Sequence, residues 1–369
     1  MTDPKMYWVG LNLVKGIGSV RFKALLDAFG SPEAAWNASQ DAWTQAGLSQ
    51  KVVESFQRVR MGVSLEQIWE RLQSLGVEVL TWDDERYPRH LKEIDQPPPV
   101  LYVRGTLTVE DEWAVAIVGT RRVTAYGRQV AEDVATALAH NGVTIVSGLA
   151  RGVDSIAHQA ALRAGGRTLA VLGNGVDIIY PPENRQLATQ IMEHGAMVSD
   201  YPLGTQPDGI NFPPRNRIIS GLSMAVVIVE AGMTSGALIT ATFAAEQGRD
   251  VFAVPGNINA PQSQGTNRLI RDGAQPLLNP QDILEALNLT MVTEHQAARV
   301  VLPSDPVEAR LFQLLSHEPR HVDEIRSQAD MPIETVSATL AMMELKGMVR
   351  QVGGMNYVAV KEHPEAYEV

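Results

Sequence analysis

The sequence has 369 residues, 45% of them apolar and 20% charged, which is the balance of a folded chain of two or three domains rather than a disordered one. The net charge of −11 argues against a nonspecific polycation, and the absence of cysteine excludes disulfides, Cys-ligated metal centres and thiol nucleophiles. The first residues lack the pattern of a signal peptide, and the apolar run 224–229 is too short to span a bilayer, so we expect a cytoplasmic protein without membrane contact.

Residues 1–78 are predicted to form a helical domain, because their apolar side chains recur at helical spacing. Within this domain, Gly16 and Gly18 separate the end of one helix from a new amphipathic helix. This arrangement fits a helix-hairpin-helix, in which glycines let backbone N–H groups approach a phosphate. A plain tight turn between packed helices explains the same residues, and the sequence leaves both interpretations open.

A proline-rich joint at 96–99 leads into a different pattern within the predicted core, 79–290. Apolar runs there alternate with helical stretches, which indicates an α/β fold whose parallel sheet is covered on both faces. A glycine closely follows each run, and the loops at the carboxyl ends of such strands share one edge, where ligands bind. The runs are 114–118, 143–146, 168–172, 224–229 and 250–254.

The first run ends in a loop that combines glycine with two positive charges. Gly119 permits a tight turn, Thr120 follows it, and Arg121 and Arg122 supply charge beside exposed N–H groups, so the loop is a candidate anion cradle. It is not the G-x-G-x-x-G fingerprint, and no acidic residue follows at the distance expected for a ribose contact. We therefore expect no dinucleotide, and no other cofactor is indicated.

The second run ends at Gly148 and Arg151, shortly before Asp154 and His158. The last two are four residues apart on one predicted helix, so they could face each other as an acid/base pair or as half of a metal site. The alternative is an aspartate that caps the helix with a histidine packed behind it. A histidine without further ligands is more often structural, and we favour this alternative.

Two later loops add candidates for the same edge. Gly173 and Gly175 follow the third run and fit a loop that a ligand approaches closely. Ser235 and Gly236 precede a predicted helix whose exposed N-terminus would attract an anion.

The segment 212–223 just before the fourth run is the most informative. Arg215 and Arg217 are expected to neutralise adjacent phosphates, while Phe212 stacks on a base and Asn216 bonds a base edge or the backbone. In the alternative, the two arginines brace the loop against local carboxylates such as Asp208. The second arginine cluster, in the first loop, favours phosphate binding.

Lysine is absent between Lys92 and Lys346, which excludes a P-loop or Schiff-base lysine from the core. The sequence also lacks a G-x-S-x-G elbow and a two-metal carboxylate cluster. We therefore expect no catalytic residues, no metal and no enzymatic activity.

After a predicted linker at 291–306, residues 307–369 are predicted to form a winged helix. The predicted helices are 307–316, 322–328 and 333–345, and the wing is 348–358, turned at Gly353 and Gly354. The third helix occupies the recognition position but contains Glu334, Glu344 and no Lys or Arg. Because major-groove readers normally carry positive charge or amides, we expect an accessory or interaction module.

Taken in order, these segments resemble the DNA-processing protein A family, DprA, also called Smf. Each motif alone is weak, but the ordered set is specific and extends over the whole chain. The stretches that carry the resemblance are 116–122 (AIVGTRR), 147–158, 171–181, 212–223 (FPPRNRIISGLS), 235–241 (SGALITA) and 254–256 (VPG).

The resemblance implies a helical N-terminal domain, similar to SAM or helix-hairpin-helix domains, an extended Rossmann-like core and a C-terminal winged helix. It also implies a bacterial protein of natural transformation that dimerises through its core, protects incoming single-stranded DNA and loads the RecA recombinase without a catalytic step. By position, Arg121 and Arg122 would hold phosphate from the first loop, and Arg215 and Arg217 from the Arg-Asn-Arg loop.

Two other functions compete with this one. Phosphoribohydrolases share a related fold, and in that reading Glu230 would assist cleavage of a nucleotide, but their P-G-G-x-G-T-x-x-E pattern is absent. A transcriptional regulator would read duplex DNA with the winged helix, and the charge-poor recognition helix counts against it.

Overall fold

Six helices occupy the first 74 residues, and three of them begin where a side chain caps the N-terminus. Ser31, Ser39 and Ser64 each accept a hydrogen bond from a backbone N–H of the first turn. Gly30, with φ of 76°, ends the second helix in the left-handed conformation. The helices are α1 (Lys5–Asn12), α2 (Ser19–Phe29), α3 (Pro32–Asn37), α4 (Gln40–Gln45), α5 (Gln50–Gly62) and α6 (Leu65–Ser74).

The structure is a computed structural model that describes residues 3–288, 306–315, 320–329, 331–345, 348–352 and 354–359. The chain divides into two compact units, Met1–Thr290 and Met291–Val369. Several residues named above therefore lie outside the described part of the chain. They are the predicted linker up to residue 305, together with Ser316, Lys346 and Gly353.

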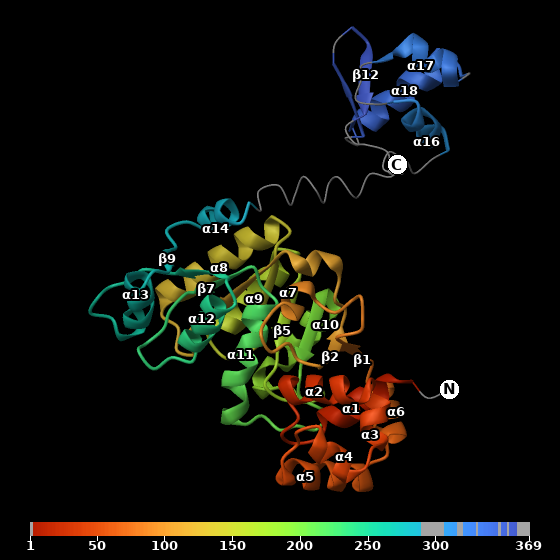
Figure 1. Ribbon diagram of the computed structural model, residues 1–369. Coiled ribbons are helices and arrows are strands. Elements are labelled where there is room, and N and C mark those ends of the chain that lie inside the picture. The colour runs from red at the N-terminus through yellow and green to blue at the C-terminus, as the bar shows by residue number, and fades with distance from the viewer. Residues whose placement is uncertain are drawn as a thin grey trace. The chain divides into compact units, whose positions relative to one another are not determined.

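A nine-stranded sheet forms the centre of residues 3–288, in the order β1-β2-β6-β5-β4-β3-β7-β8-β9 (Figure 1). The strands from β6 to β9 in this order are parallel, and β2 pairs antiparallel with both β1 and β6. The strands are β1 (Val77–Thr81), β2 (Val100–Gly105), β3 (Ala114–Val118), β4 (Thr144–Ser147), β5 (Thr168–Val171), β6 (Gly195–Ser199), β7 (Ala225–Ile228), β8 (Asp250–Ala253) and β9 (Gln275–Pro276).

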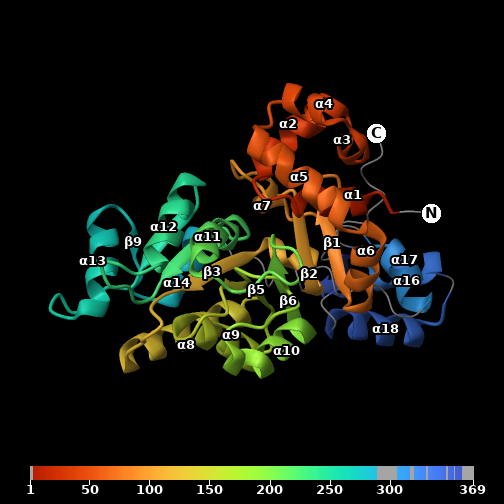
Figure 2. The same cartoon turned by 90° about the horizontal axis from the view of Figure 1, so that it is seen from below.

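Helices cover both faces of this sheet. Figure 2 shows α8, α9 and α10 below the strands and α11 and α12 above them. These helices are α8 (Ala125–His140), α9 (Val153–Arg163), α10 (Arg185–His194), α11 (Phe212–Gly221) and α12 (Ala237–Glu246). Shorter elements are α7 (Arg89–Lys92), α13 (Gln264–Arg271), α14 (Pro280–Ala286) and the 3₁₀ helices η1 (Val109–Glu112), η2 (Pro182–Asn184), η3 (Gly209–Asn211) and η4 (Pro261–Ser263).

The predicted α/β core is thus confirmed, with all five apolar runs present as parallel strands. The chain order reverses at β3, which pairs with β4 on one side and with β7 on the other. In doubly wound sheets the loops at such a reversal diverge and leave a crevice outside the carboxyl ends of the strands. The topology therefore places such a crevice between the β3 and β7 loops.

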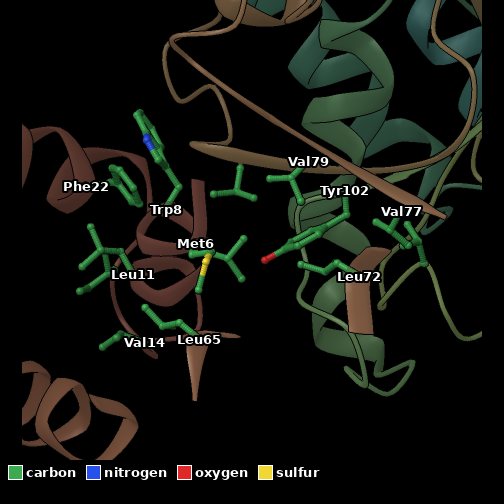
Figure 3. Packing of buried hydrophobic residues seen from close by; sticks show 14 of the residues in the cluster. Met6, Trp8, Leu11, Val14, Phe22, Leu65, Leu72, Val77, Val79 and Tyr102 are labelled. Carbon is green, nitrogen blue, oxygen red and sulfur yellow. The ribbon is translucent and has the colours of Figure 1, made fainter. Parts of the chain in front are cut away.

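The N-terminal helices share a hydrophobic core with the sheet (Figure 3). Met6 and Trp8 of α1 belong to the same buried cluster as Val79 of β1 and Tyr102 of β2. The Tyr102 hydroxyl also donates a hydrogen bond to Asn12 Oδ1 at 2.9 Å. Helices α1–α6 therefore belong to the first unit and are not packed as an isolated bundle.

The second unit contains the predicted winged helix. Its three helices pack around Leu311, Ile325, Val336 and Leu340, and a small sheet has the order β10-β12-β11. Strand β10 was not predicted, because it has only two residues. The elements are α16 (Pro306–Gln313), β10 (Arg320–His321), α17 (Val322–Ala329), α18 (Ile333–Leu345), β11 (Val349–Gln351) and β12 (Asn356–Ala359).

Among the residues described, no helix combines the length and the apolar character that crossing a bilayer requires. In the same part of the chain, no group of three or more His, Asp or Glu side chains is placed to hold a metal ion.

Candidate functional site

A hollow of about 770 Å³ lies at the carboxyl ends of β3 and β7, at the point where the chain order reverses. Its wall combines the β3–α8 loop, the start of α11 and the start of α12. Nine of the predicted site residues line it: Gly119, Thr120, Arg121, Arg122, Phe212, Arg215, Asn216, Ser235 and Gly236.

A second, smaller hollow adjoins the first and shares Arg121, Tyr180, Phe212 and Arg215 with it. It adds the ends of β4 and β5, where the predicted residues Gly148, Arg151 and Gly173 lie. We call the two hollows together the strand-end groove. The groove thus follows the carboxyl ends of β7, β3, β4 and β5 in turn.

The β3–α8 loop is held rigidly against β7. Thr120 N–H donates to the Glu230 carbonyl oxygen at 2.7 Å. Both donors of Thr124, its N–H and its hydroxyl, bond the two carboxylate oxygens of Glu230 at 3.0 and 2.5 Å. The loop therefore presents Arg121 and Arg122 from a fixed backbone.

Arg121 and Arg122 are the groove's available cations. Both side chains are exposed, and within residues 3–288 neither forms an ion pair with a carboxylate. Arg121 lies over the ring of Phe212, with its guanidinium carbon 5.8 Å from the centroid. Exposed, unpaired guanidinium groups at the rim of a hollow are suited to binding phosphate.

Arg215 lies on helix α11, which corrects the prediction that the Arg-Asn-Arg segment is a loop. Its side chain is buried, and its guanidinium donates to the carbonyl oxygens of Gly148, at 3.1 Å, and Val171. Burial lowers its pKa to about 10, and the nearby Asp154 partly offsets this shift. Arg215 therefore remains charged at neutral pH, but the protein already engages much of its hydrogen-bonding capacity.

Asn216 also differs from its predicted role, although it lines the hollow. Its amide donates to the Gly236 carbonyl oxygen at 3.3 Å, and its Oδ1 accepts from Arg215 Nε at 3.3 Å. Both ends of the side chain thus bond the protein. Asn216 therefore joins the starts of α11 and α12.

Two predicted residues, Arg217 and Gly175, line neither hollow. Arg217 donates to Asp200 at 2.7 Å, so the arginine pair is split between the groove and an internal ion pair. Asp208, the carboxylate proposed as a brace, instead accepts from Ile210 N–H. A Cβ on Gly175 would lie 2.6 Å from Asp177 Oδ1, so this glycine serves the packing of its own loop.

Asp154 and His158 form no acid/base pair. Asp154 accepts from the N–H groups of Gly148 and Ala150, in the loop before α9, at 3.2 and 3.3 Å, so it is structural but does not cap the helix as the favoured alternative expected. The hydroxyl of Thr168 donates to Ile145 O, so it accepts from His158 Nδ1 at 2.6 Å. Burial, with a smaller contribution from Arg215, lowers the pKa of His158 to about 3, so the ring is neutral.

Arg151 lines the smaller hollow and is paired with Glu183. The Arg151 side chain is 57% exposed and the Glu183 side chain is 50% exposed. An ion pair this exposed is weak, and a phosphate can compete with it.

Sequence reasoning did not assign several other residues of the groove. Tyr180, Thr234 and Ile239 line the larger hollow, and Asp154 lines it as well. Tyr180 follows the third strand's glycine loop and Ile239 lies one turn into α12, so each belonged to a segment already singled out. Their placement depends on how the loops converge, which the sequence pattern does not specify.

Comparison with known proteins places these features in one family of sequences. The family described as DNA recombination-mediator protein A matches residues 78–288, and the DprA winged helix domain matches residues 295–355. Protein Smf of Synechocystis is 38% identical over 388 residues, which cover 95% of this chain and 98% of that protein.

Two solved structures share the fold. DNA processing protein A of Streptococcus pneumoniae superposes with a TM-score of 0.68 at 34% identity, covering 77% of this chain and 98% of that one. DNA processing protein A of Helicobacter pylori, in a structure described as revealing its single-stranded DNA binding mode, gives a TM-score of 0.52 at 35% identity. That superposition covers 57% of this chain and 95% of the other.

Proposed function

Because the chain belongs to the DNA recombination-mediator protein A family, DprA/Smf, we propose that it binds single-stranded DNA in the strand-end groove. In this role it protects incoming single strands during natural transformation and loads RecA onto them in the cytoplasm. Its action needs no cofactor and no catalytic step, and its working form is a homodimer formed through the Rossmann-like core. The described single-stranded DNA binding of the Helicobacter pylori relative supports the first part of the proposal.

The observation that carries the proposal is the combination of Arg121 and Arg122 with Phe212 in one hollow of about 770 Å³. Two exposed, unpaired cations match the phosphates of a nucleic-acid backbone, and a half-buried aromatic ring beside them matches a base. The volume of this hollow is larger than one small anion would fill. The groove also continues past the ends of β4 and β5, as a strand of several nucleotides requires.

We assign different roles to the predicted residues of the groove. Arg121 and Arg122 contact phosphate, Phe212 stacks on a base, and the N-terminus of helix α12, which follows Ser235 and Gly236, adds the positive end of its dipole. Thr120 and the glycines Gly119, Gly148 and Gly173 form part of the groove wall, and a Cβ at any of the three glycines would meet protein atoms. Arg151 joins the phosphate contacts when Glu183 releases it.

The enzymatic alternative loses its proposed residue in this geometry. Glu230 is buried at 3% exposure, and Thr124 bonds both of its carboxylate oxygens. It therefore fastens the β3–α8 loop and is not directed at a nucleotide in the hollow. We assign Glu230 a structural role.

We propose that the winged helix is an interaction module and not a reader of duplex DNA. Helix α18 has Glu334 in its first turn and no basic residue in its last. Its exposed residues are Glu334, Thr335, Ala338, Ala341, Met342 and Glu344. Such a surface lacks the cations and amides with which recognition helices contact bases.

The test is fluorescence anisotropy of the full chain with labelled oligo-dT and with a duplex of equal length, over a salt series. We expect tight single-strand binding and weak duplex binding. In Arg121→Gln/Arg122→Gln, the slope of log affinity against log salt should become less steep by about 1.4, since each lost phosphate contact removes about 0.7.

The matched control is Arg58→Gln/Arg163→Gln, which changes the net charge equally. Arg58 is exposed on α5, and Arg163 ends α9, whose other end faces the groove. If the control variant loses as much affinity as the groove variant, binding is nonspecific and the proposal fails. Wild-type protein that does not bind oligo-dT contradicts the proposal directly.

A further inference from the structure

A buried aspartate and a buried arginine meet in front of a single glycine at the floor of the groove. A Cβ added to Gly148 would lie 2.8 Å from Asp154 Oδ2 and 2.8 Å from Arg215 Nη2. The two charged groups therefore converge on the space that a side chain at position 148 would occupy. Asp154 and Arg215 are 6% exposed each.

Their hydrogen bonds connect three parts of the groove. Asp154 holds the loop after β4 through the N–H groups of Gly148 and Ala150. Arg215 bonds the carbonyl oxygens of Gly148 and of Val171, the last residue of β5. Because Arg215 belongs to the first turn of α11, these bonds fix the start of that helix against the ends of β4 and β5.

Phe212 opens the same helix and lies against this assembly. The guanidinium carbon of Arg215 is 5.9 Å from the centroid of its ring. The arginine that bonds the strand ends thus also supports the ring that lines both hollows. Displacing Arg215 would displace Phe212 and the loop that carries Arg151.

From this geometry we infer that Asp154 is a positioning residue for single-stranded DNA binding, acting through Arg215 to hold Phe212 and the β4 loop in place. We assign Arg215 itself no phosphate contact, because Asp154 offsets its charge and its Nη1 and Nε groups already bond the protein. The inference rests on the proposed function of the groove.

Glu183 is a second carboxylate beside the same groove, but unlike Asp154 it is not part of a buried hydrogen-bond network. It is half exposed, and within the described residues its carboxylate pairs with Arg151 at the smaller hollow. Removing Glu183 frees a cation and disturbs no buried network. Simple electrostatics predicts that losing either carboxylate strengthens DNA binding, whereas the positioning role predicts opposite effects for the two.

The experiment compares full-length wild type, Asp154→Asn and Glu183→Gln for oligo-dT affinity over a salt series. We expect Asp154→Asn to bind about tenfold more weakly with an unchanged salt slope, since a charge-assisted hydrogen-bonding group is lost. Glu183→Gln should bind about twofold to fivefold more tightly, as expected for an exposed ion pair. Tighter binding by Asp154→Asn would overturn the inference.

Arg215→Lys gives a second, independent readout, with Arg163→Lys at the far end of α9 as its matched control. Arg163 is exposed and lines neither hollow, so this change should leave oligo-dT affinity unchanged. Arg215→Lys should lose about tenfold, because an ammonium cannot reproduce the planar bonds to two carbonyls. Arg215→Lys that binds like wild type contradicts the inference.

Thermal unfolding separates a folding defect from a binding defect. It shows whether each variant is native at the assay temperature, and if Asp154→Asn is not, Arg215→Lys decides the inference. Wild-type protein that fails to bind oligo-dT refutes the proposed function, whereas wild-type binding with tighter binding by Asp154→Asn refutes only the inference.

Discussion

The ring of Phe212 lies nearly parallel to that of Tyr180, with centroids 5.9 Å apart and planes inclined by 22°. The two residues come from different loops, one at the start of α11 and the other after β5. Both line the larger and the smaller hollow, so the stacked pair stands where the two meet. This position places a flat apolar surface along the path that we propose for the DNA.

Replacing Phe212 with leucine should weaken binding to oligo-dT by about 1–3 kcal/mol while the salt slope stays unchanged, because stacking on a base involves no counterion release. The measurement is anisotropy with oligo-dT and with an abasic oligonucleotide of equal length. The abasic strand offers no base to stack on, so it should bind wild type and variant alike. An equal loss for both strands would show that Phe212 only supports the fold.

Arg217 should contribute to stability and not to DNA binding. It pairs with Asp200, and both side chains are only 17% exposed, so Arg217→Met leaves a largely buried carboxylate without its cation. We expect the free energy of unfolding to fall by about 2–4 kcal/mol in urea denaturation. The double variant Asp200→Asn/Arg217→Met should recover part of this loss.

In the same Arg217→Met variant, the salt slope of oligo-dT binding should match that of wild type at a temperature where the protein is folded. A slope reduced by about 0.7 would instead show that Arg217 contacts a phosphate.

His158 should make the protein less stable in mild acid. Burial lowers its folded pKa to about 3 from 6.5, so the unfolded chain binds the proton first as pH falls. Its contribution to stability is therefore complete above pH 6.5 and is lost toward pH 3, at up to about 1.4 kcal/mol per pH unit.

The change that tests this effect is His158→Asn, whose amide can still donate to Thr168. Asp154 and Asp200 have raised pKa values, chiefly through burial, and oppose the trend, so the difference between wild type and variant isolates the histidine. Urea denaturation at pH 7.5, 6.5 and 5.5 should show that difference shrinking. A constant difference would mean that His158 titrates normally.

Glu230 should contribute to stability and should catalyse no hydrolysis of nucleotides. Glu230→Ala removes both hydrogen bonds to Thr124 and should lower the free energy of unfolding by about 2–3 kcal/mol. Chromatography of wild-type protein incubated with nucleoside monophosphates should detect no free base. Base release that disappears in Glu230→Ala at a temperature where that variant is folded would restore the enzymatic alternative.

Much of the fold was predictable from local patterns. Continuous apolar runs mark strands buried on both faces, and the helix at 333–345 was predicted with its observed bounds. Strands β1, β2, β6 and β9 of the large sheet were missed. Strand β6, Gly195–Ser199, begins with two small residues. Strands β1 and β2 pair antiparallel beyond the last parallel strand, and the alternation of strands and helices along the sequence does not predict them.

The groove was predictable as an edge but not as a set of side chains. Pro213 and Pro214 suggested a loop, yet proline is well tolerated in the first turn of a helix, and there they open α11. On an extended loop, residues two apart point the same way, whereas on a helix they point in different directions. That is why Arg215 faces the groove and Arg217 faces Asp200.

The core that the N-terminal helices share with the sheet also governs the order of events during synthesis. Trp8 and Phe22 emerge from the ribosome first, but Tyr102, in the same buried cluster, emerges roughly 100 residues later. At translation rates of about 5–20 residues per second, the aromatic face of the nascent helices stays uncovered for about 5–20 s. Chaperones that hold nascent chains therefore have a defined apolar surface to bind during that interval.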